Sequence, residues 1–600
     1  MRLYVLRVFS LLLILGGPRC GFSWEQLGPY RYAGVDRIVA IGDVHGALPQ
    51  LREVLRRSNV IDENDHWRGG QTHLVSVGDL LDRGPQSRGV MDLLMGLQVE
   101  AASAGGMVHV VMGNHEVMNL SGELNYTSKA EFASYIDLQS AANAIADEPP
   151  GFAGQRRAMA LDGPYGSWLV KRPVAIVVNK TLFLHGGVST RMRNLDLDSL
   201  NEKAHAQLLT FLKARKVLLN AGVIAPQTGF RAAQAAAHKR AQANIEPKAV
   251  TTAANEYDQV LANGLLFVSE GPVWYRGTAL CHPFTEQQTT LDALQALKAD
   301  RVVIGHTPTQ QRKIQSRMDG RVLRIDTGMN VDWYHGHPAA LVITAESTRV
   351  VYTDLDETEV TAENNRAWKR PWGMSDAGLE SFLKNARITK IEDLATGVTK
   401  PKRVTLEQGV RKIRAVFKTL DTDPKLEKRR WTRLGNRSDR YQYEVAAYRL
   451  DRLLGFNMVP PAVLRAINGK PGVLQYWIEG AINEKDRRTR SIPYTGECTP
   501  RSQYTLMNVF DALIYNEDRT LANVLYSKRD WNLWLIDHTR AFRSDRKIPP
   551  YLRKARFDMT PQLRDMLAKI DKQKLAALAP YLHPKQISAI VARAKLVKRL

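Results

Sequence analysis

Several short stretches of this sequence place metal-binding side chains directly after an apolar run. The first is RIVAIGDVHG, in which the apolar residues 38–41 predict a short buried strand that is followed by Asp43 and His45. Open α/β sheets place their sites at the carboxyl ends of their strands. An oxygen and a nitrogen ligand two residues apart suit a divalent metal ion. For a single stretch of this kind, a polar loop that binds no metal ion is the alternative interpretation. The repetition of the pattern along the chain decides between the two.

The same construction recurs in GDLLDRG (78–84), GNHE (113–116), HGG (185–187) and the GH of RVVIGHT (305–306). Two metal ions a few ångströms apart need a shared carboxylate and several nitrogen or oxygen ligands. The repeated motifs therefore predict a two-metal site. Its expected ligands are Asp43 and His45 for the first ion, Asp79 as the bridge, and Asn114, His185 and His306 for the second ion.

The motifs also hold groups suited to phosphoryl chemistry. A metal pair lowers the pKa of a bound water and so provides a nucleophile in line with phosphorus. His115 stands beside the ligand Asn114 and is the candidate acid for the leaving oxygen. Asp82 is placed to hold its imidazole charged and oriented, and Arg83 offers a bidentate grip on phosphoryl oxygens.

In their order along residues 36–355, these motifs resemble the phosphoprotein phosphatases among the calcineurin-like metallophosphoesterases. EGPVWYRG (270–277) and IDTGM (325–329) are most similar to the Shewanella-like branch. The resemblance implies an α/β fold with a layered β-sandwich flanked by helices. It implies hydrolysis of phosphate monoesters on protein Ser/Thr or Tyr with two manganese, iron or zinc ions. It also implies that Arg276 binds phosphate and that Tyr334 lines the site.

Hydrolysis of dinucleoside polyphosphates is a competing activity for the same fold and the same metal motifs. The sequence leaves this alternative open.

A different set of residues lies near the other end of the chain. VLYS and NLWLI predict a hairpin whose outer ends bring Asn523 and Asp537 together on one metal ion. Asp518, just before this hairpin, is placed to accept a proton from a substrate hydroxyl. Lys418 ends the predicted strand RAVFK, and Glu444 begins a helix that Gly455 ends. A strand lysine paired with a helix glutamate positions ATP phosphates in phosphoryl transfer.

These features of residues 396–545 resemble the atypical kinases, especially the secretory-pathway casein kinases and the phosphatidylinositol kinases. The resemblance implies a two-lobed α+β domain that binds ATP with magnesium or manganese. The sequence departs from kinase motifs at residues 516–518 (Asn-Glu-Asp) and 537–539 (Asp-His-Thr), and no clear glycine-rich loop precedes Lys418. The alternative is a non-catalytic domain that recruits a substrate or adapts the phosphatase to an anionic surface.

Length and charge support this division. Six hundred residues exceed what one core usually serves, so we predict a phosphoesterase domain at 36–355 with a helical insert at 201–263, a linker at 356–395 and a kinase-like domain at 396–600. Residues 401–600 hold 41 Lys and Arg against 20 Asp and Glu, which is +21 of the net charge of +23. This predicts an acidic partner or anionic surface, or else a solvated basic face. No nucleic-acid motif accompanies the charge, so we do not expect nucleic acid as a partner.

The first 23 residues predict a signal peptide. Arg2 and Arg7 precede an apolar run at residues 8–15 that is too short to span a bilayer comfortably, and small residues precede a plausible cut before Trp24. An uncleaved anchoring helix is the alternative. No later run is long and apolar enough for a membrane helix, so we expect an exported protein, periplasmic or secreted. After the cut only Cys281 and Cys498 remain, too few for a disulfide framework.

Overall fold

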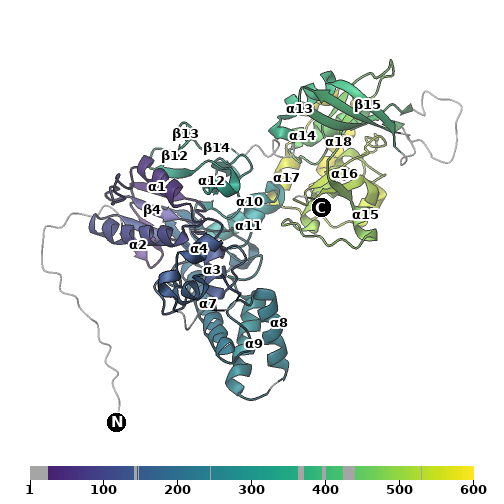
Figure 1. Cartoon of the computed structure of the whole chain (residues 1–600). Helices are drawn as coiled ribbons and strands as arrows, with labels where there is room; N and C mark the ends of the chain where they lie inside the picture. The colour runs from purple at the N-terminus through teal and green to yellow at the C-terminus, as the bar shows by residue number, and fades with distance from the viewer. Residues whose placement is uncertain are drawn as a thin grey trace, which may run out of the picture.

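The computed structural model describes residues 25–140, 145, 147–243, 245–362, 371–394, 401–422, 439–528 and 530–600. The predicted signal peptide lies outside the described residues. Figure 1 shows two bodies, one coloured purple to teal and one green to yellow. They meet where α11 (Pro283–Ala296) lies beside α17 (Pro561–Ala568).

The first body is built on two sheets. One has the order β1-β2-β6-β7-β8-β10-β9-β14 and the other β13-β12-β11-β3-β4-β5. The strands of the first are β1 (Glu25–Gly28), β2 (Arg31–Ala33), β6 (Ala175–Val178), β7 (Thr181–Leu184), β8 (Arg301–Ile304), β9 (Gln315–Arg317), β10 (Val322–Arg324) and β14 (Thr361–Ala362). Those of the second are β3 (Arg37–Ile41), β4 (His73–Ser76), β5 (Met107–Val110), β11 (Ala339–Thr344), β12 (Thr348–Tyr352) and β13 (Thr358–Glu359).

Alternation along the strands explains why the sheets stack. Ile38 and Ala40 of β3 pack in one cluster with Phe183 from the other sheet, whereas Val39 and Ile41 belong to the cluster on the helix-covered side. Successive residues of a strand point to opposite faces, so an entirely apolar strand is buried on both. The predicted layered α/β sandwich is therefore confirmed.

Helices cover the outer faces of this sandwich. The helices of the first body are α1 (Leu48–Arg57), α2 (Ser87–Ser103), α3 (Asn114–Ser121), α4 (Lys129–Ala133), α5 (Phe152–Ala158), α6 (Gly166–Leu169), α7 (Leu197–Asn220), α8 (Phe230–Ala243), α9 (Lys248–Asn263), α10 (Gly277–Leu280), α11 and α12 (Val331–Tyr334). The stretch predicted as a helical insert falls on α7, α8 and α9, which project together from the sandwich (Figure 1). Phe211 of α7 stacks on Tyr257 of α9 with ring centroids 4.4 Å apart, so the projection has its own apolar contact.

The second body has a five-stranded sheet, a small hairpin sheet and a helical core. The larger sheet has the order β15-β16-β17-β21-β20 and the smaller β22-β23-β24. The elements of the second body are α13 (Asp376–Asn385), β15 (Arg387–Asp393), β16 (Lys402–Gln408), β17 (Arg411–Lys418), β18 (Asp421–Thr422), β19 (Asp439–Arg440), α14 (Gln442–Leu454), β20 (Ala462–Leu464), β21 (Val473–Tyr476), β22 (Ala481–Asn483), α15 (Glu484–Thr489), α16 (Pro500–Ile514), β23 (Val524–Ser527), β24 (Leu533–Leu535), α17 and α18 (Pro584–Val597). The predicted α+β character is confirmed. Across the described residues, we find no helix with both the length and the apolar character needed to traverse a bilayer.

The structure departs from the predicted linker, residues 356–395. Within it, α13 buries Leu379, Phe382 and Leu383 in the same cluster as the five-stranded sheet, and β15 is the edge strand of that sheet. The sequence looked polar because an edge strand keeps most of its side chains in water, and because α13 presents a single apolar stripe. Residues 363–370 of the predicted linker lie outside the described residues.

Candidate active site

Three neighbouring parallel strands deliver the first group of site residues. Asp43 and His45 follow β3, Asp79 follows β4, and Asn114 begins α3 after β5. Strand β4 pairs in parallel with both β3 and β5, so their carboxyl ends lie at one edge of the sheet. Parallel strands of this kind form a site at that edge.

The second sheet completes the site. His185 follows β7 and His306 follows β8, and these two strands are also parallel neighbours. The His306 backbone N–H donates to Asp43 Oδ1 at 3.0 Å, which joins the edge of one sheet to the edge of the other. The structure therefore brings together all six residues predicted as phosphoesterase metal ligands.

Several of these residues have a left-handed backbone. The φ angles of His45, Asp79 and His306 are 48°, 53° and 63°, and those of Asp82 and Arg83 are 72° and 68°. Non-glycine residues seldom adopt this conformation, and each such residue costs about 1–3 kcal/mol unless its surroundings enforce it. Backbone strain concentrated in the motif loops is a physical sign of a functional site.

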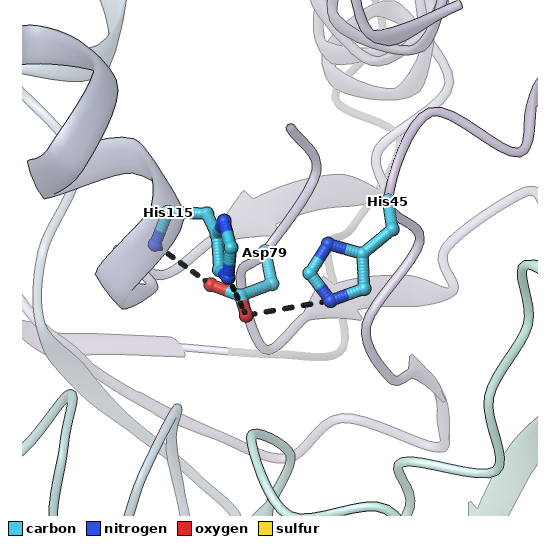
Figure 2. Close-up of side chains that lie close together, drawn as sticks. All are labelled: His45, Asp79 and His115. Atoms are coloured by element: carbon cyan, nitrogen blue, oxygen red, sulfur yellow. Dashed lines mark hydrogen bonds and ion pairs between the residues drawn. The ribbon is translucent and has the colours of Figure 1, made fainter. Parts of the chain in front are cut away.

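Asp79 lies at the centre of the cluster, as Figure 2 shows with His45 and His115. Its Oδ1 is 3.1 Å from His185 Nε2, and its Oδ2 is 3.6 Å from His45 Nε2. Two groups of potential ligands contain it: His45, Asp79 and His115, and Asp79, His185 and His306, with the ligand atoms of each group within 4.8 Å of one another. A carboxylate shared by both groups is what a bridged metal pair requires.

Hydrogen bonds fix which imidazole nitrogen faces the centre. Nδ1 of His45 lies 2.8 Å from the Leu81 carbonyl, and Nδ1 of His185 lies 2.8 Å from the Val77 carbonyl, so in both rings Nε2 faces the ligand cluster. In His306 the arrangement is reversed, because Nε2 lies 3.0 Å from the carbonyl of Trp274. Backbone carbonyls that hold the second nitrogen orient metal-binding histidines.

The electrostatics of the cluster fit a divalent cation. Burial raises the pKa of Asp43, and the charges of Asp326 and Asp79 raise it further. Burial lowers the pKa of His45 and of His306 well below the ordinary value, so both rings are neutral donors. Oδ2 of Asp326 is buried and has no hydrogen-bond partner among the described residues. Neutral imidazoles and crowded carboxylates form a donor set that a divalent metal ion stabilises.

His115 and Asp82 form a hydrogen-bonded pair beside this centre. Nδ1 of His115 is 2.6 Å from Asp82 Oδ2, and its Nε2 is 3.8 Å from Asp79 Oδ2. Burial lowers the pKa of His115, but the charges of Asp79 and Asp82 outweigh it and raise the pKa overall. Thr127 Oγ1 donates to the other Asp82 oxygen at 2.7 Å, which fixes the carboxylate. The imidazole is thus held with Nε2 toward the metal ligands.

The two predicted phosphate-binding arginines differ in position. Arg83 contacts His45 Nε2, and its guanidinium lies 5.6 Å from the ring centroid of Tyr126 and 5.2 Å from that of Tyr334. Arg276 donates through one nitrogen to the His306 carbonyl at 2.7 Å and to Thr307 Oγ1 at 3.1 Å. Both cations therefore lie at the edge of the ligand cluster.

Glu116 was given no role in the sequence analysis, although it lies in the GNHE motif. It is fully buried and accepts hydrogen bonds of 2.8 Å from the backbone N–H groups of Asp79, Leu80 and Gly113. One carboxylate thus holds the loop that carries Asp79 against the start of α3. The signal available in the sequence was the position of Glu116 three residues after Gly113, where a glutamate caps the start of a helix.

The second predicted constellation is only partly brought together. Lys418 Nζ donates to Glu444 Oε1 at 2.6 Å and to Asp537 Oδ1 at 2.9 Å. Burial lowers the pKa of Lys418, but the charges of Glu444 and Asp537 raise it above the ordinary value. His538, next to Asp537, lies with Nδ1 3.0 Å from Glu444 Oε2. The strand lysine, the helix glutamate and the hairpin aspartate therefore form one ionic cluster, in which Lys418 and Glu444 are buried and Asp537 is part-exposed.

Asn523, Asp537 and Asp518 are arranged less simply. The predicted hairpin is present as β23 and β24, and the Ile536 N–H donates to the Asn523 carbonyl at 3.2 Å, so its outer ends are adjacent. The Asn523 side chain donates to the Asp518 carbonyl at 3.0 Å, and the Asp518 carboxylate accepts from Arg540 at 3.0 Å. An arginine thus pairs with the predicted proton acceptor.

The sandwich and its strand-end cluster of histidines and carboxylates define a metal-dependent phosphoesterase. Residues 36–310 match the family model of calcineurin-like phosphoesterases. The first body therefore has the calcineurin-like phosphoesterase fold, and the protein is a hydrolase.

Individual relatives narrow the comparison. The chain is 27% identical over 308 residues to Shewanella-like protein phosphatase 1 of Plasmodium berghei, a match that covers 50% of this chain and 69% of the relative. It is 31% identical over 227 residues to Shewanella-like protein phosphatase 2 of Arabidopsis thaliana, with coverage of 33% and 58%.

Solved structures were also matched. A cold-active protein-tyrosine phosphatase of a psychrophilic Shewanella species is 26% identical, with 56% of this chain and 83% of that chain covered and a TM-score of 0.41. A hydra Fam20 structure with bound sugar is 18% identical, with 37% and 87% covered and a TM-score of 0.29.

Proposed function

We propose that the protein is an exported phosphatase that hydrolyses phosphate monoesters on phosphoproteins, at Ser/Thr or Tyr. The observation that carries this proposal is the position of Asp79, shared by two ligand groups, beside the His115–Asp82 pair. This combination supplies a place for two cations and an oriented acid within one buried cluster. The names of the Shewanella-like relatives support a phosphoprotein as the substrate.

We assign the predicted ligands to two divalent ions, manganese, iron or zinc. Asp43 and His45 would hold one, Asn114, His185 and His306 the other, and Asp79 would contact both. When bound, such a pair supplies an activated water and neutralises charge on the phosphoryl group. Asn114 Oδ1 is already 2.9 Å from His185 Nε2, so ligands of the second ion converge without rearrangement of the strands.

The chain's own groups handle the proton and the phosphate. Asp82 keeps a proton on Nδ1 of His115, so Nε2 can deliver a second proton to the leaving oxygen. Arg83 lies over the rings of Tyr126 and Tyr334, which stabilises the guanidinium where it can bind anionic oxygens. Arg276 is tied to the carbonyl of the ligand His306 and so is in place to bind the same phosphoryl group.

Export is supported by the bond between Cys281 and Cys498, the two cysteines that remain after the predicted cut. Disulfides form and persist in oxidising compartments such as the periplasm and the extracellular space. A periplasmic or secreted location is therefore proposed.

Phosphopeptides carrying phosphoserine, phosphothreonine or phosphotyrosine test the proposal directly. Manganese-loaded protein should release phosphate from at least one peptide class, and His115→Asn should abolish most of that release. His337→Asn is the matched control, because His337 pairs with Asp354 at the surface. Turnover of a dinucleoside polyphosphate alone, with no peptide turnover, would replace the proposal with nucleotide hydrolysis.

For the C-terminal half we propose a nucleotide site of kinase type that uses ATP with magnesium or manganese. The ionic cluster of Lys418, Glu444 and Asp537 carries this second proposal. A lysine held by a helix glutamate positions nucleotide phosphates, and an adjacent aspartate with Asn523 suits the metal ion. Arg540 on Asp518 must move before Asp518 can accept a proton from a substrate hydroxyl.

A thermal-shift experiment separates this site from a basic adaptor. ATP with either metal ion should raise the melting temperature of the full chain, and Asp537→Ala should remove the shift. Asp558→Ala is the matched control, since Asp558 is exposed and pairs with Arg501. No shift with any nucleotide would leave the basic half as an adaptor for an acidic partner or anionic surface.

A further inference from the structure

The two halves of the chain meet on the segment that also carries Arg276. The ring of Phe284, at the start of α11, lies 5.7 Å from that of Phe456, and the Thr560 hydroxyl donates to the Phe284 carbonyl. His282 Nε2 lies 3.1 Å from the Gly455 carbonyl. Residues 276–296 therefore line the phosphatase site at one end and dock the C-terminal half at the other (Figure 1).

A disulfide bond also joins the two halves, and it lies close in sequence to Arg276 of the phosphatase site. Cys281 follows α10 directly and is joined to Cys498 of the C-terminal half, with Cα atoms 5.3 Å apart. Arg276 is the residue that precedes the same short helix. From inside the sandwich, Arg317 donates to the carbonyls of Thr278 and Cys281 at 2.5 and 2.6 Å. Cys281 and Arg276 thus lie at opposite ends of the same short helix, and Arg317 holds that helix in place.

The residue before Cys498 reaches the arginine itself. Glu497 Oε1 is 3.8 Å from Arg276 Nε, and the two side chains are 44% and 30% exposed. The Glu497 segment is fixed on its own side, because Tyr494 and Gln503 both donate to the Cys498 carbonyl. The rim of the phosphatase site therefore contains a carboxylate from the other half of the chain.

We propose that Glu497 is a specificity-determining residue of the phosphatase site. It competes with the substrate's phosphoryl oxygens for Arg276, and it favours substrates that carry a cation beside the phosphate. The disulfide positions it there. This inference rests on the proposed role of Arg276 in binding phosphate, and it requires no particular amino acid under the phosphate.

The size of the effect follows from Coulomb's law. Two unit charges about 4 Å apart interact by about 1 kcal/mol in a water-like medium, which corresponds to roughly a fivefold change in a binding constant. Both side chains are part-exposed, and ion pairs at the protein surface contribute at most about 1 kcal/mol. Removing the charge of Glu497 should therefore strengthen phosphate binding by about fivefold and should weaken the preference for basic substrates by a similar factor.

The test uses the full, manganese-loaded chain with Glu497→Gln. Glu479→Gln is the matched control, because Glu479 is 48% exposed and pairs with Arg414 on β17 of the C-terminal half. Calorimetry measures binding of inorganic phosphate, and kinetics with p-nitrophenyl phosphate give KM and kcat separately. A pair of phosphopeptides with flanking arginines or flanking glutamates measures the preference.

We expect Glu497→Gln to lower both the phosphate dissociation constant and KM about fivefold, with a smaller change in kcat, and to reduce the arginine-over-glutamate peptide ratio. The double variant Cys281→Ser and Cys498→Ser should shift these constants in the same direction. Adding Glu497→Gln to this double variant should shift them by less than Glu497→Gln shifts them in the wild-type chain.

Constants within twofold of the wild-type values in Glu497→Gln would overturn the inference. An unchanged phosphate affinity in Arg276→Ala would overturn it as well, by removing the arginine from the site. Failure of the phosphoprotein proposal is distinguishable: if phosphopeptides are not turned over but p-nitrophenyl phosphate is, the phosphate-binding and KM comparisons still decide the role of Glu497.

Discussion

The two candidate sites of this chain solve the problem of buried charge in opposite ways. At the phosphatase site Asp43, Asp79 and Asp326 are buried, and burial lowers the pKa of His45 and of His306, so these two rings are neutral. In the C-terminal half, Lys418 supplies a positive charge that pairs with both Glu444 and Asp537. The first site requires an external cation, whereas the second has one built into the chain. The comparison indicates that metal dependence is stricter in the N-terminal half.

The sites also share a feature. Asp79 and Asp537 both have a left-handed backbone, with φ of 53° and 65°, and both lie within three residues of the end of a strand. A sharp turn at this point directs a carboxylate across the end of the sheet, at an energetic cost that the surrounding hydrogen bonds offset. Strand-end aspartates of this kind mark both sites.

The largest expected effect is a loss of phosphatase activity that leaves nucleotide binding by the C-terminal half unchanged. His115→Asn should lower the phosphatase kcat by about 10²–10⁴-fold, because it removes the proton donor that Asp82 orients. The nucleotide-induced thermal shift of the C-terminal half should remain. A decrease of less than tenfold, measured with p-nitrophenyl phosphate and with a phosphopeptide, would contradict the assignment of His115.

The next largest effect concerns stability in the C-terminal half. Lys418→Met leaves Glu444 and Asp537 without their buried cation, and breaking a buried pair in this way costs about 3–5 kcal/mol. Calorimetric unfolding of the full chain measures it. Arg414→Met is the control, because its exposed pair with Glu479 should contribute at most about 1 kcal/mol. Equal losses in the two variants would contradict the picture of a buried ionic cluster.

A smaller effect depends on pH at the segment between the halves. Burial raises the pKa of Glu286 to about 7, and Tyr275 donates to its carboxyl group at 2.9 Å. Because this folded-state pKa lies above the unfolded value, the protonated form contributes stability below about pH 4.5, and that contribution is lost as the pH rises toward 7. The loss amounts to at most about 3 kcal/mol.

Glu286→Gln should therefore flatten the decline in stability between about pH 4.5 and 7, as measured by denaturant unfolding at several pH values. An unchanged pH profile in this variant would show that Glu286 does not carry the effect.

The smallest predicted effect concerns the loop that supports Asp79. Glu116→Gln keeps the shape of the side chain but replaces a charged acceptor of backbone N–H groups with a neutral amide. Weakening such bonds costs about 1–3 kcal/mol, and the variant should lose stability by that amount and bind manganese more weakly. Glu100→Gln, whose carboxylate accepts from the exposed Trp67 loop, is the control. Wild-type manganese affinity in Glu116→Gln would exclude this supporting role.

Much of the phosphatase site was predictable because its ligands follow apolar strands. The runs before Asp43, Asp79 and His185 indicate strands from composition alone, and a parallel sheet gathers their ends at one edge. The hairpin that precedes Asp537 was predictable for a similar reason, since both of its strands are short and apolar around a polar turn.

Contacts between distant segments were not predictable in this way. No local pattern joins Cys281 to Cys498 across 217 residues, or Glu497 to Arg276. The pairing of Asp518 with Arg540 was missed because a side chain's partner depends on how a loop folds, and motif spacing does not specify that. Helix α13 was missed because its single apolar stripe is short and lies in a polar region.

Manganese stoichiometry tests the central claim, a metal pair bridged by Asp79, most directly. Full chains would be stripped, reloaded without nucleotide and analysed for bound manganese per chain. Asp79→Asn should lose both ions of the pair, Asp43→Asn should lose one, and Asp537→Asn should match the wild type, because only Asp79 belongs to both ligand groups. Wild-type manganese content in Asp79→Asn, or loss of a single ion from it, would contradict the bridged pair.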